Sequence, residues 1–367
     1  MASDKPSTDI ISFAKATEIK RLDANTYQAN LVDSFCIGAV PNGGYVASCI
    51  LQAAILHGSS RSPSNPQPHV MNAHFEYLNR TQVGPATILI EDVKPGRQLT
   101  TLHATLYQGN LHQDDTSASA SDLLPTTLGN MKKRVTAYLV MTNLSSLTGL
   151  SLNTQFTLLP PPLVPSSSPS QNPDFSLLKQ DRDPHWTAIP SLLPLGSGSG
   201  SASSYIRALQ NTHFYIPRQG QVRKSIIDLW IRLSSGENFT EASLGYVSDC
   251  WPYVVEAYRP RSKEEEEENN AKEEEEGVGF RHNAKHWYPT VVMNVEQKKA
   301  APEKGWEWLR MRVSSKEVKG GRFDLEVLVM DEKGELVVVS NHVGLVLGSE
   351  RNLAGRGKEG MKGQSRI

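Results

Sequence analysis

Two apolar segments stand out along the chain, and both lack the polar stripe of a surface helix. The first, YVASCILQAAILHG, follows the turn cluster PNGG and ends at Gly58. The second, ASLGYVSDCWPYVVEAY, covers residues 242–258. A helix that is apolar nearly all round is normally buried. The pattern therefore predicts two buried helices, near 44–57 and 242–257.

Segments with the alternation typical of half-buried strands lie around each predicted helix. They are rich in β-branched residues, alternate apolar with polar positions, and are separated by turn residues. The sequence DEKG at 331–334 favours a tight hairpin between the last two of them. The predicted strands are 26–33, 70–78, 86–93, 99–107, 134–142, 226–233, 288–297, 306–315, 323–330 and 335–347.

The same order of elements occurs twice in the chain. Each half begins with a strand, continues with a buried helix, and ends with four further strands. A helix that is apolar on most faces needs a sheet curved around it. The residues alone therefore predict an α+β protein built from two similar halves.

Biased composition separates the two halves. Residues 144–204 contain PPPLVPSSSPSQNP and PLGSGSGSASS, which is typical of a linker. We expect one short ordered stretch within it, around Phe175 to Pro194. The N-terminal domain is then 1–143 and the C-terminal domain 205–348, and the Gly/Lys/Arg-rich residues 349–367 are expected to form a flexible tail.

An acidic insertion at 260–285 interrupts the second domain. Its two glutamate runs, 264–268 and 273–276, hold nine of the 39 acidic residues. Because like charges repel one another, we expect a solvated loop outside any core. The net charge of the whole chain is −1, so the rest of it is mildly basic. That balance suits a small anionic ligand and gives no indication of nucleic-acid binding.

The three cysteines, Cys36, Cys49 and Cys250, are too few and too irregularly spaced for a disulfide framework. They favour a reducing compartment. The first residues of the chain are charged throughout and lack the apolar core of a signal peptide. No apolar run approaches the roughly 20 residues that a membrane-spanning helix needs, so no membrane span is expected.

Several catalytic motifs are absent from the sequence. The segment GSGSG at 196–200 has Gly198 where the nucleophile elbow G-x-S-x-G needs its serine. There is no C-x-x-C pair, no phosphate-binding loop and no dinucleotide fingerprint. His282 and His286 lie four residues apart without a third ligand in pattern, so no metal site is predicted. These observations disfavour a serine hydrolase, a redox enzyme and a nucleotide hydrolase.

Short motifs in both halves resemble those of the type II acyl-CoA thioesterases and the related thioesterase-like superfamily. In the first half they are GGY at 43–45, HFEYL at 74–78, and GRQ at 96–98 followed by LTTLHATLYQG. In the second half they are LWIR at 229–232, LGYVSD at 244–249, WYPT at 287–290 and DEKGELVVVSNH at 331–342. The motifs occur in the family's order, and the resemblance covers roughly 26–143 and 205–348.

This resemblance implies a tandem, or double, hotdog fold. Two antiparallel sheets would each wrap around a central apolar helix and would meet edge to edge. The implied activity is hydrolysis of an acyl-CoA to free acid and CoA by an activated water, without a metal or redox cofactor. The partner would be the acyl-CoA substrate, and the chain would be a monomeric pseudo-dimer or a homo-oligomer.

The family's catalytic set, carried over by motif, is Asp249 on the second helix and Thr290 on the next strand. The third family residue is a glutamine, whose position holds His342 in this sequence. A carboxylate between apolar neighbours, such as Asp249, needs a firm partner or a task. Thr290 and His342 are also ordinary strand residues, so a structural role for them stays open.

Gly43, Gly44 and Tyr45 are the predicted contacts to the substrate and its oxyanion. The glycines supply turn geometry, and the helix N-terminus that they open offers N–H groups to a carbonyl oxygen. Arg97 is the predicted contact for a CoA phosphate, although its place in a hairpin also suits a solvated arginine.

Two other functions remain open. The histidine in place of the family glutamine is consistent with a non-catalytic acyl-CoA-binding hotdog protein. The second alternative is a hotdog hydratase or dehydratase of secondary metabolism. The sequence lacks the D-x-N-x-x-H arrangement expected of such an enzyme. Release of free CoA from acyl-CoA would separate all three.

The chain ends with Ser365-Arg366-Ile367, a small, a basic and a large aliphatic residue. Peroxisomal import reads a C-terminal tripeptide of this chemistry, with Ser-Lys-Leu as the reference form. The expected location is therefore cytoplasmic or peroxisomal.

Overall fold

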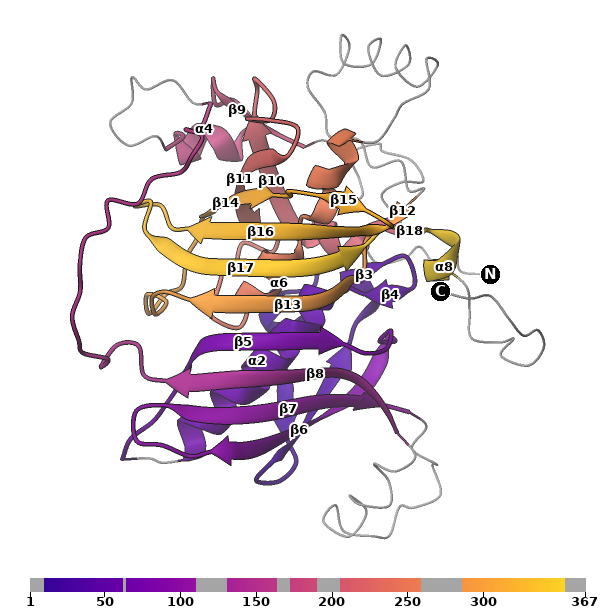
Figure 1. Cartoon of the computed structure of the whole chain (residues 1–367), viewed down its shortest axis with the longest axis vertical. Helices are drawn as coiled ribbons and strands as arrows, with labels where there is room; N and C mark the ends of the chain where they lie inside the picture. Colours follow the sequence, from indigo (N-terminus) through magenta and orange to yellow (C-terminus); the bar gives the residue numbers. More distant parts are fainter. Residues whose placement is uncertain are drawn as a thin grey trace, which may run out of the picture.

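A continuous curved sheet forms the body of the protein (Figure 1). The computed structural model describes residues 10–61, 64–109, 131–163, 172–189, 205–258 and 286–353. Within these residues, 14 strands pair antiparallel in one sheet, and two small two-stranded sheets lie beside it.

The large sheet contains β1 (Ile19–Arg21), β2 (Thr26–Leu31), β5 (His69–Tyr77), β6 (Gly84–Lys94), β7 (Thr100–Gln108), β8 (Lys132–Thr142), β9 (Trp186–Ala188), β10 (Thr212–Pro217), β11 (Ile226–Leu233), β13 (Thr290–Gln297), β14 (Leu309–Ser314), β15 (Val318–Lys319), β16 (Arg322–Met330) and β17 (Leu336–Leu345). The small sheets pair β3 (Cys36–Ile37) with β4 (Val40–Pro41), and β12 (His286–Trp287) with β18 (Leu347–Gly348). The helices are α1 (Phe13–Ala16), α2 (Gly43–Arg61), α4 (Phe175–Lys179), α6 (Leu244–Asp249) and α8 (Glu350–Leu353), with 3-10 turns η1 (Asp33–Phe35), η3 (Arg207–Asn211) and η4 (Pro252–Tyr258).

The strand order is the same in both halves of the sheet. Neighbouring strands run β2-β6-β7-β8-β5 in the first half and β11-β14-β16-β17-β13 in the second. The two expected sheets meet edge to edge, because β5 pairs with β13 and places Asn72 opposite Glu296. Since the hydrogen bonding continues across this seam, they form one sheet rather than two.

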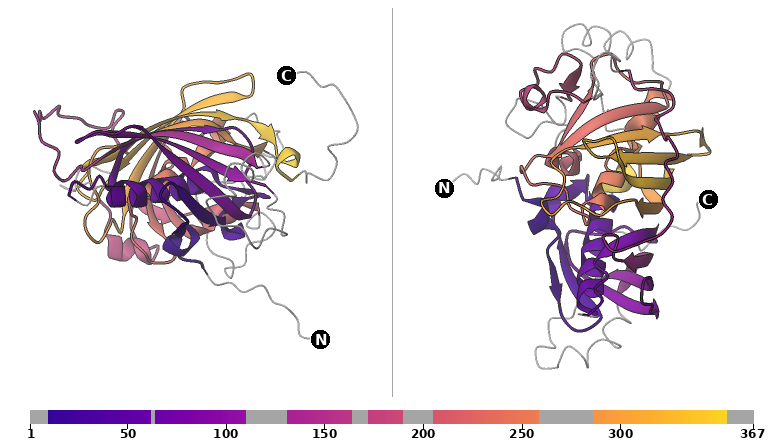
Figure 2. Two further views of the ribbon diagram at one scale, coloured as in Figure 1. Left: turned by 90° about the horizontal axis from the view of Figure 1, so that it is seen from below. Right: turned by 90° about the vertical axis from the view of Figure 1, so that its left-hand side faces the viewer.

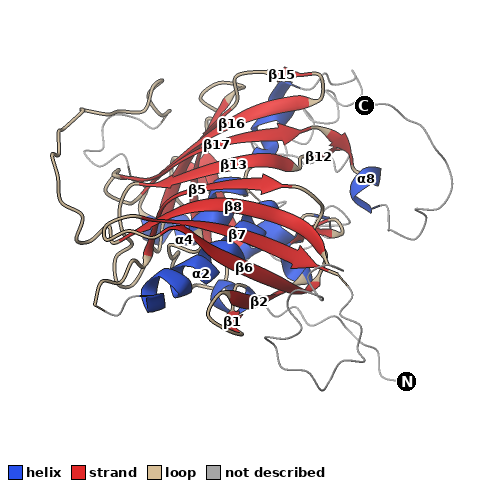
Figure 3. Cartoon of the chain, turned by 60° about the horizontal axis from the view of Figure 1, so that its bottom comes forward, coloured by secondary structure: helices blue, strands red, loops and turns tan. Residues whose placement is uncertain are grey.

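Helices α2 and α6 lie side by side on the concave face of this sheet (Figures 2 and 3). They approach closely because both carry glycine at the contact. A Cβ atom on Gly44 would lie 2.5 Å from the carbonyl oxygen of Gly245. Beside it, the Tyr246 N–H donates to the Ser48 hydroxyl at 2.9 Å. One buried apolar cluster therefore contains residues of both halves.

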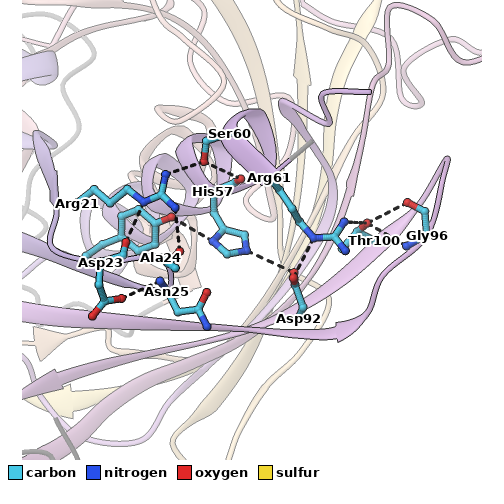
Figure 4. A network of polar contacts seen from close by, with 11 residues as sticks. Arg21, Asp23, Ala24, Asn25, His57, Ser60, Arg61, Asp92, Gly96 and Thr100 are labelled. Carbon is cyan, nitrogen blue, oxygen red and sulfur yellow. Dashed lines mark hydrogen bonds and ion pairs between the residues drawn. The ribbon is translucent and has the colours of Figure 1, made fainter. Parts of the chain in front are cut away.

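Helix α2 continues one turn beyond Gly58, where the apolar pattern predicted its end. Its last turn is fixed by polar contacts to β2 and β6 (Figure 4). The His57 ring lies 3.1 Å from the Tyr27 hydroxyl and 3.3 Å from the Asp92 carboxylate. Arg61 also donates to Asp92, at 2.8 Å. These bonds stabilise a helix end that lacks the apolar residues on which the prediction relied.

The second apolar segment is not one helix, as the pattern predicted. Helix α6 ends at Asp249, and the chain continues after Pro252 as the 3-10 turn η4. Proline has no N–H to donate, and its ring clashes with the preceding turn, so an α-helix breaks before it. The break leaves Asp249 at a helix end, from which its side chain reaches α2.

The predicted linker contributes to the second half of the sheet. Helix α4 and strand β9 lie within the stretch that was expected to be ordered, and β9 pairs with β10 at the edge of the sheet. Strand β10 was not predicted. A small apolar cluster covers the outer face there, formed by Leu178, Trp186, Ala188, Tyr215, Trp230 and Trp308.

The predicted flexible tail, 349–367, begins with ordered structure, since helix α8 covers Glu350–Leu353. The whole acidic insertion at 260–285 (which includes His282), the glycine-rich 196–200 and the terminal Ser365-Arg366-Ile367 lie outside the described residues. In the described part of the chain, no helix has both the length and the apolar character needed to cross a membrane.

Candidate active site

A pocket of about 270 Å³ opens where the two halves of the protein meet. Its walls come from the N-terminus of α2, the residues after β5, the end of α6 and the segment before β13. Asp249, Thr290 and Gly43 line it together, although they are far apart in the sequence. The structure therefore brings the predicted carboxylate, threonine and helix start into one cavity.

Asp249 is only 5 % exposed, and hydrogen bonds hold both of its carboxylate oxygens. Oδ2 accepts the Gly44 N–H at 2.7 Å and the Asn42 amide at 3.3 Å. Oδ1 accepts the Thr290 hydroxyl at 2.6 Å. These donors, together with the positive end of α2, compensate the removal of the carboxylate from water.

The three residues that open α2 differ in what they offer the pocket. Asn42 caps the helix, because its Oδ1 accepts the Tyr45 N–H at 2.9 Å. The Gly44 N–H is committed to Asp249. The Gly43 N–H has no hydrogen-bond partner among the described residues, and Gly43 lines the pocket. Gly43 is thus the member of this group that can donate to a substrate.

Tyr45, a predicted substrate contact, points into the core instead. Its side chain is fully buried, and its hydroxyl donates to the Ala16 carbonyl at 2.7 Å. It does not line the pocket. The helix period explains this placement, because Tyr45 lies about 200° around the helix from Gly43.

His342 lies behind Asp249 and does not line the pocket. Its Nδ1 is 3.6 Å from Asp249 Oδ1, too long for a normal hydrogen bond. Its Nε2 is 2.9 Å from the Ser340 hydroxyl, which donates to the Asn294 carbonyl at 2.5 Å. Because that hydroxyl has one hydrogen, it must accept from His342, which assigns a proton to Nε2.

Aromatic side chains form much of the pocket wall: Tyr77, Tyr253, Trp287 and Tyr288. Desolvation, with a smaller contribution from Asp249, raises the pKa of Tyr77 well above its usual value. The Tyr77 hydroxyl therefore stays protonated, and it donates to the Gly43 carbonyl at 3.0 Å. This bond stiffens the start of α2 next to the Gly43 N–H, for which the described residues supply no acceptor.

Charge is distributed unevenly over the pocket. Asp249 is the one acidic residue among the described residues that line it, whereas Arg80 and Arg351 supply two cations. The guanidinium of Arg80 lies over the Trp287 ring at 5.1 Å.

Arg97, the predicted CoA contact, lies elsewhere. It lines a separate polar hollow with Asn65, Gln67 and Thr142. Thr142 lies beside the start of β5, and Tyr77 is at its end, so Arg97 and the pocket are at opposite ends of the strand. The structure therefore does not bring Arg97 to Asp249.

Both halves of the chain match known protein domains. Residues 31–122 match the acyl-CoA thioesterase N-terminal domain, and residues 174–346 match the C-terminal domain. The chain belongs to the acyl-CoA thioesterase family. It is also 41 % identical over 364 residues to the thioesterase-like protein TwmA of Talaromyces wortmannii, a match that covers 96 % of this chain and 97 % of that protein.

Solved structures similar to this thioesterase-family protein have the hotdog fold. One is a protein of unknown function with that fold from Alicyclobacillus acidocaldarius, with a TM-score of 0.58 at 15 % identity, covering 91 % of this chain and 97 % of that one. Another is the acyl-CoA thioesterase II TesB2 of Mycobacterium marinum, with a TM-score of 0.50 at 15 % identity, covering 92 % and 98 %. At such identities the likeness shows the fold alone.

Sequence reasoning missed several residues in and around the thioesterase-family pocket. Asn42 had a detectable signal, because asparagine directly before an apolar helix favours an N-cap. Ser340 and Arg351 had none, since their contacts are made only in the folded protein. The structure adds them as the partner of His342 and a cation of the pocket.

Proposed function

We propose that this thioesterase-family protein hydrolyses acyl-CoA-type thioesters, with Asp249 as the general base for an attacking water. The observation that carries the proposal is the fixed carboxylate on the pocket wall. Asp249 Oδ1 has only the Thr290 hydroxyl within hydrogen-bond distance among the described residues. A carboxylate oxygen accepts about two hydrogen bonds, so Oδ1 retains a lone pair for a water in the pocket.

The reaction follows from this geometry. Water attacks the thioester carbonyl carbon while Asp249 removes its proton, a contribution of about 10²–10⁴-fold in rate. The resulting oxyanion is stabilised by the Gly43 N–H, and one such donor is worth about 10²–10³-fold. The tetrahedral intermediate collapses, the C–S bond breaks, and the proton held by Asp249 passes to the departing thiolate.

A covalent route through Cys250 is disfavoured, although this residue also lines the pocket. Desolvation and the nearby Asp249 raise the pKa of the Cys250 thiol far above its usual value. Its Sγ–H group donates to the Val247 carbonyl at 3.2 Å. A protonated, buried thiol is a poor nucleophile. With Asp249 as the base, the Thr290 hydroxyl serves to orient the carboxylate and the attacking water.

We also infer that the two halves are two hotdog units in tandem. The identical strand order in both halves supports this duplication. In this arrangement Asp249 comes from the second unit and Gly43 from the first, so the proposed site needs both.

Replacing Asp249 by asparagine tests the function. Asparagine keeps the size of the side chain and an acceptor for the Gly44 N–H, but it cannot take up a proton. We expect Asp249→Asn to reduce kcat for acyl-CoA hydrolysis by at least about 100-fold, measured as free CoA across a panel of acyl-CoAs. Exposed Glu317, changed to glutamine, is the matched control and should keep wild-type activity.

Each alternative gives a different result in this experiment. Activity of the Asp249→Asn variant within about threefold of wild type would exclude the general-base role. Wild-type protein that binds acyl-CoA without releasing CoA would be the binding protein of the first alternative. Conversion of an enoyl thioester to its hydroxyacyl form without CoA release would favour the hydratase.

A further inference from the structure

The C-terminal turn α8 forms part of the pocket rim, beyond the last strand of the sheet (Figure 1). Asn352 attaches it to the turn between β3 and β4. The Asn352 side chain is 2 % exposed, accepts the Ala39 N–H at 2.8 Å and donates to the Ile37 carbonyl at 2.9 Å. Gly38 lies between these two residues with φ +56°, and a Cβ there would collide with Asn352. This close fit fixes α8 against the first half of the protein.

The attachment at Asn352 places its neighbour Arg351 at the pocket. Arg351 is exposed, lines the same cavity as Asp249, and has no ion-pair partner among the residues that the structure describes. Arg80 lines the cavity as well. With Asp249 nearly buried and two guanidinium groups on the wall, the accessible part of the pocket favours an anion.

We propose that Arg351, together with Arg80, binds a phosphate group of the thiol carrier to which the acyl group is attached. This inference rests on the proposed thioester hydrolysis and adds the residues that bind the phosphate of its substrate. A guanidinium presents paired N–H donors that match phosphate oxygens. The same phosphate chemistry occurs in CoA and in the phosphopantetheine arm of a carrier protein.

Three thioesters of one acyl group test this assignment. They are the acyl-CoA, the acyl-4′-phosphopantetheine and the acyl-N-acetylcysteamine, which has no phosphate. For Arg351→Ala we expect KM to rise about tenfold for phosphate-bearing substrates. Loss of one exposed charge-assisted hydrogen bond weakens binding by roughly that factor. The KM of the N-acetylcysteamine thioester and all three kcat values should stay unchanged. The exposed Arg223, changed to alanine, is the matched control.

The pattern of effects identifies the phosphate. A KM increase with both phosphate-bearing substrates assigns Arg351 to the pantetheine phosphate that CoA and carrier proteins share. An increase with acyl-CoA alone assigns it to the phosphates of the nucleotide part. Equal effects on all three substrates, or no effect on any, would overturn the proposal while leaving thioester hydrolysis intact.

Asn352→Ala tests the positioning of α8 separately. It leaves the guanidinium in the chain but removes both bonds that hold the turn. The same selective KM increase is expected, and thermal unfolding shows whether the variant is folded.

If the wild type releases no thiol from any thioester, calorimetry with CoA and with unphosphorylated pantetheine still tests whether Arg351 binds the phosphate. Arg351→Ala must then weaken the binding of CoA and leave that of pantetheine unchanged, and any other pattern overturns the assignment.

Discussion

At the scale of single residues, the hydrogen bonds to Asp249 determine which neighbouring groups can still donate to a substrate in the pocket. Gly44 gives its N–H to the carboxylate, which leaves Gly43 as the donor at the pocket. Thr290 gives its hydroxyl to Oδ1, and the Ser340 hydroxyl accepts from His342 Nε2, the nitrogen that faces away from Asp249. A glutamine at position 342, as in the family pattern, could instead turn an amide N–H toward the carboxylate.

This difference leads to a prediction for His342→Gln. Glutamine is the residue of the family pattern at this position, so we expect kcat to be retained or raised by a few fold. His342→Ala leaves a cavity behind Asp249 in which the carboxylate can shift, so it should lower kcat by roughly tenfold. Both are measured as CoA release at saturating substrate, with His103→Gln on β7, which does not line the pocket, as the control.

A folded but nearly inactive glutamine variant would contradict this expectation. It would mean that His342 itself transfers or holds a proton during the reaction. Circular dichroism and thermal unfolding of the variant distinguish that result from a failure to fold.

At the scale of elements, the contact between α2 and α6 connects packing to chemistry. Gly44 and Gly245 allow the helices to approach until the Gly44 N–H reaches Asp249. The break at Pro252 ends the α-helical segment near that carboxylate. Both features are therefore needed for a helix N-terminus and a carboxylate from different halves to meet.

Gly44→Ala should separate these helices. The added Cβ would lie 2.5 Å from the Gly245 oxygen and 2.6 Å from Asp249 Cβ, both backbone or core positions with little freedom to move. Overpacking of this kind costs about 1–3 kcal/mol in the free energy of unfolding. We expect a clearly lower Tm, and a loss of kcat greater than tenfold because Asp249 loses its shortest backbone donor.

Gly149→Ala is the matched control for this prediction, because nothing lies within 4 Å of a Cβ at that position. It should leave Tm and kcat unchanged. If Gly44→Ala also leaves both unchanged, the helices are not held as closely as the structure indicates.

Most strands were predictable because their alternation is local, and β5, β13 and β17 lie close to the predicted ranges. Strand β10 was missed because it follows a glycine- and serine-rich stretch that looked like linker. The motif resemblance located Asp249 and Thr290, which the pocket does bring together. Arg351 could not be found in this way, since its place depends on the long-range attachment of Asn352 to Ile37 and Ala39.

At the scale of the whole molecule, the site exists only where the two halves join. The β5–β13 seam continues the backbone hydrogen bonding, and the main apolar cluster contains residues of both halves. Polar contacts reinforce the junction: Arg207 pairs with Asp33 at 2.8 Å, and Asn211 donates to the Ser34 carbonyl at 2.8 Å. The chain segment between the halves is therefore not what holds them together.

Cutting that segment tests this conclusion. A protease site inserted between Ser167 and Ser168 divides the chain after β8 and before α4, so each fragment keeps one central helix and its sheet. Burial of apolar surface contributes about 25 cal/mol for each Å² removed from water, and it continues across the junction after the cut. We expect the cleaved fragments to elute together at the size of the intact protein and to retain CoA release. Their Tm should fall modestly and become dependent on concentration, because unfolding then also separates two chains. An uncut sample of the same insertion variant is the control. Fragments that elute apart, or that associate without activity while the uncut variant is active, would show that the connection is needed to form the site.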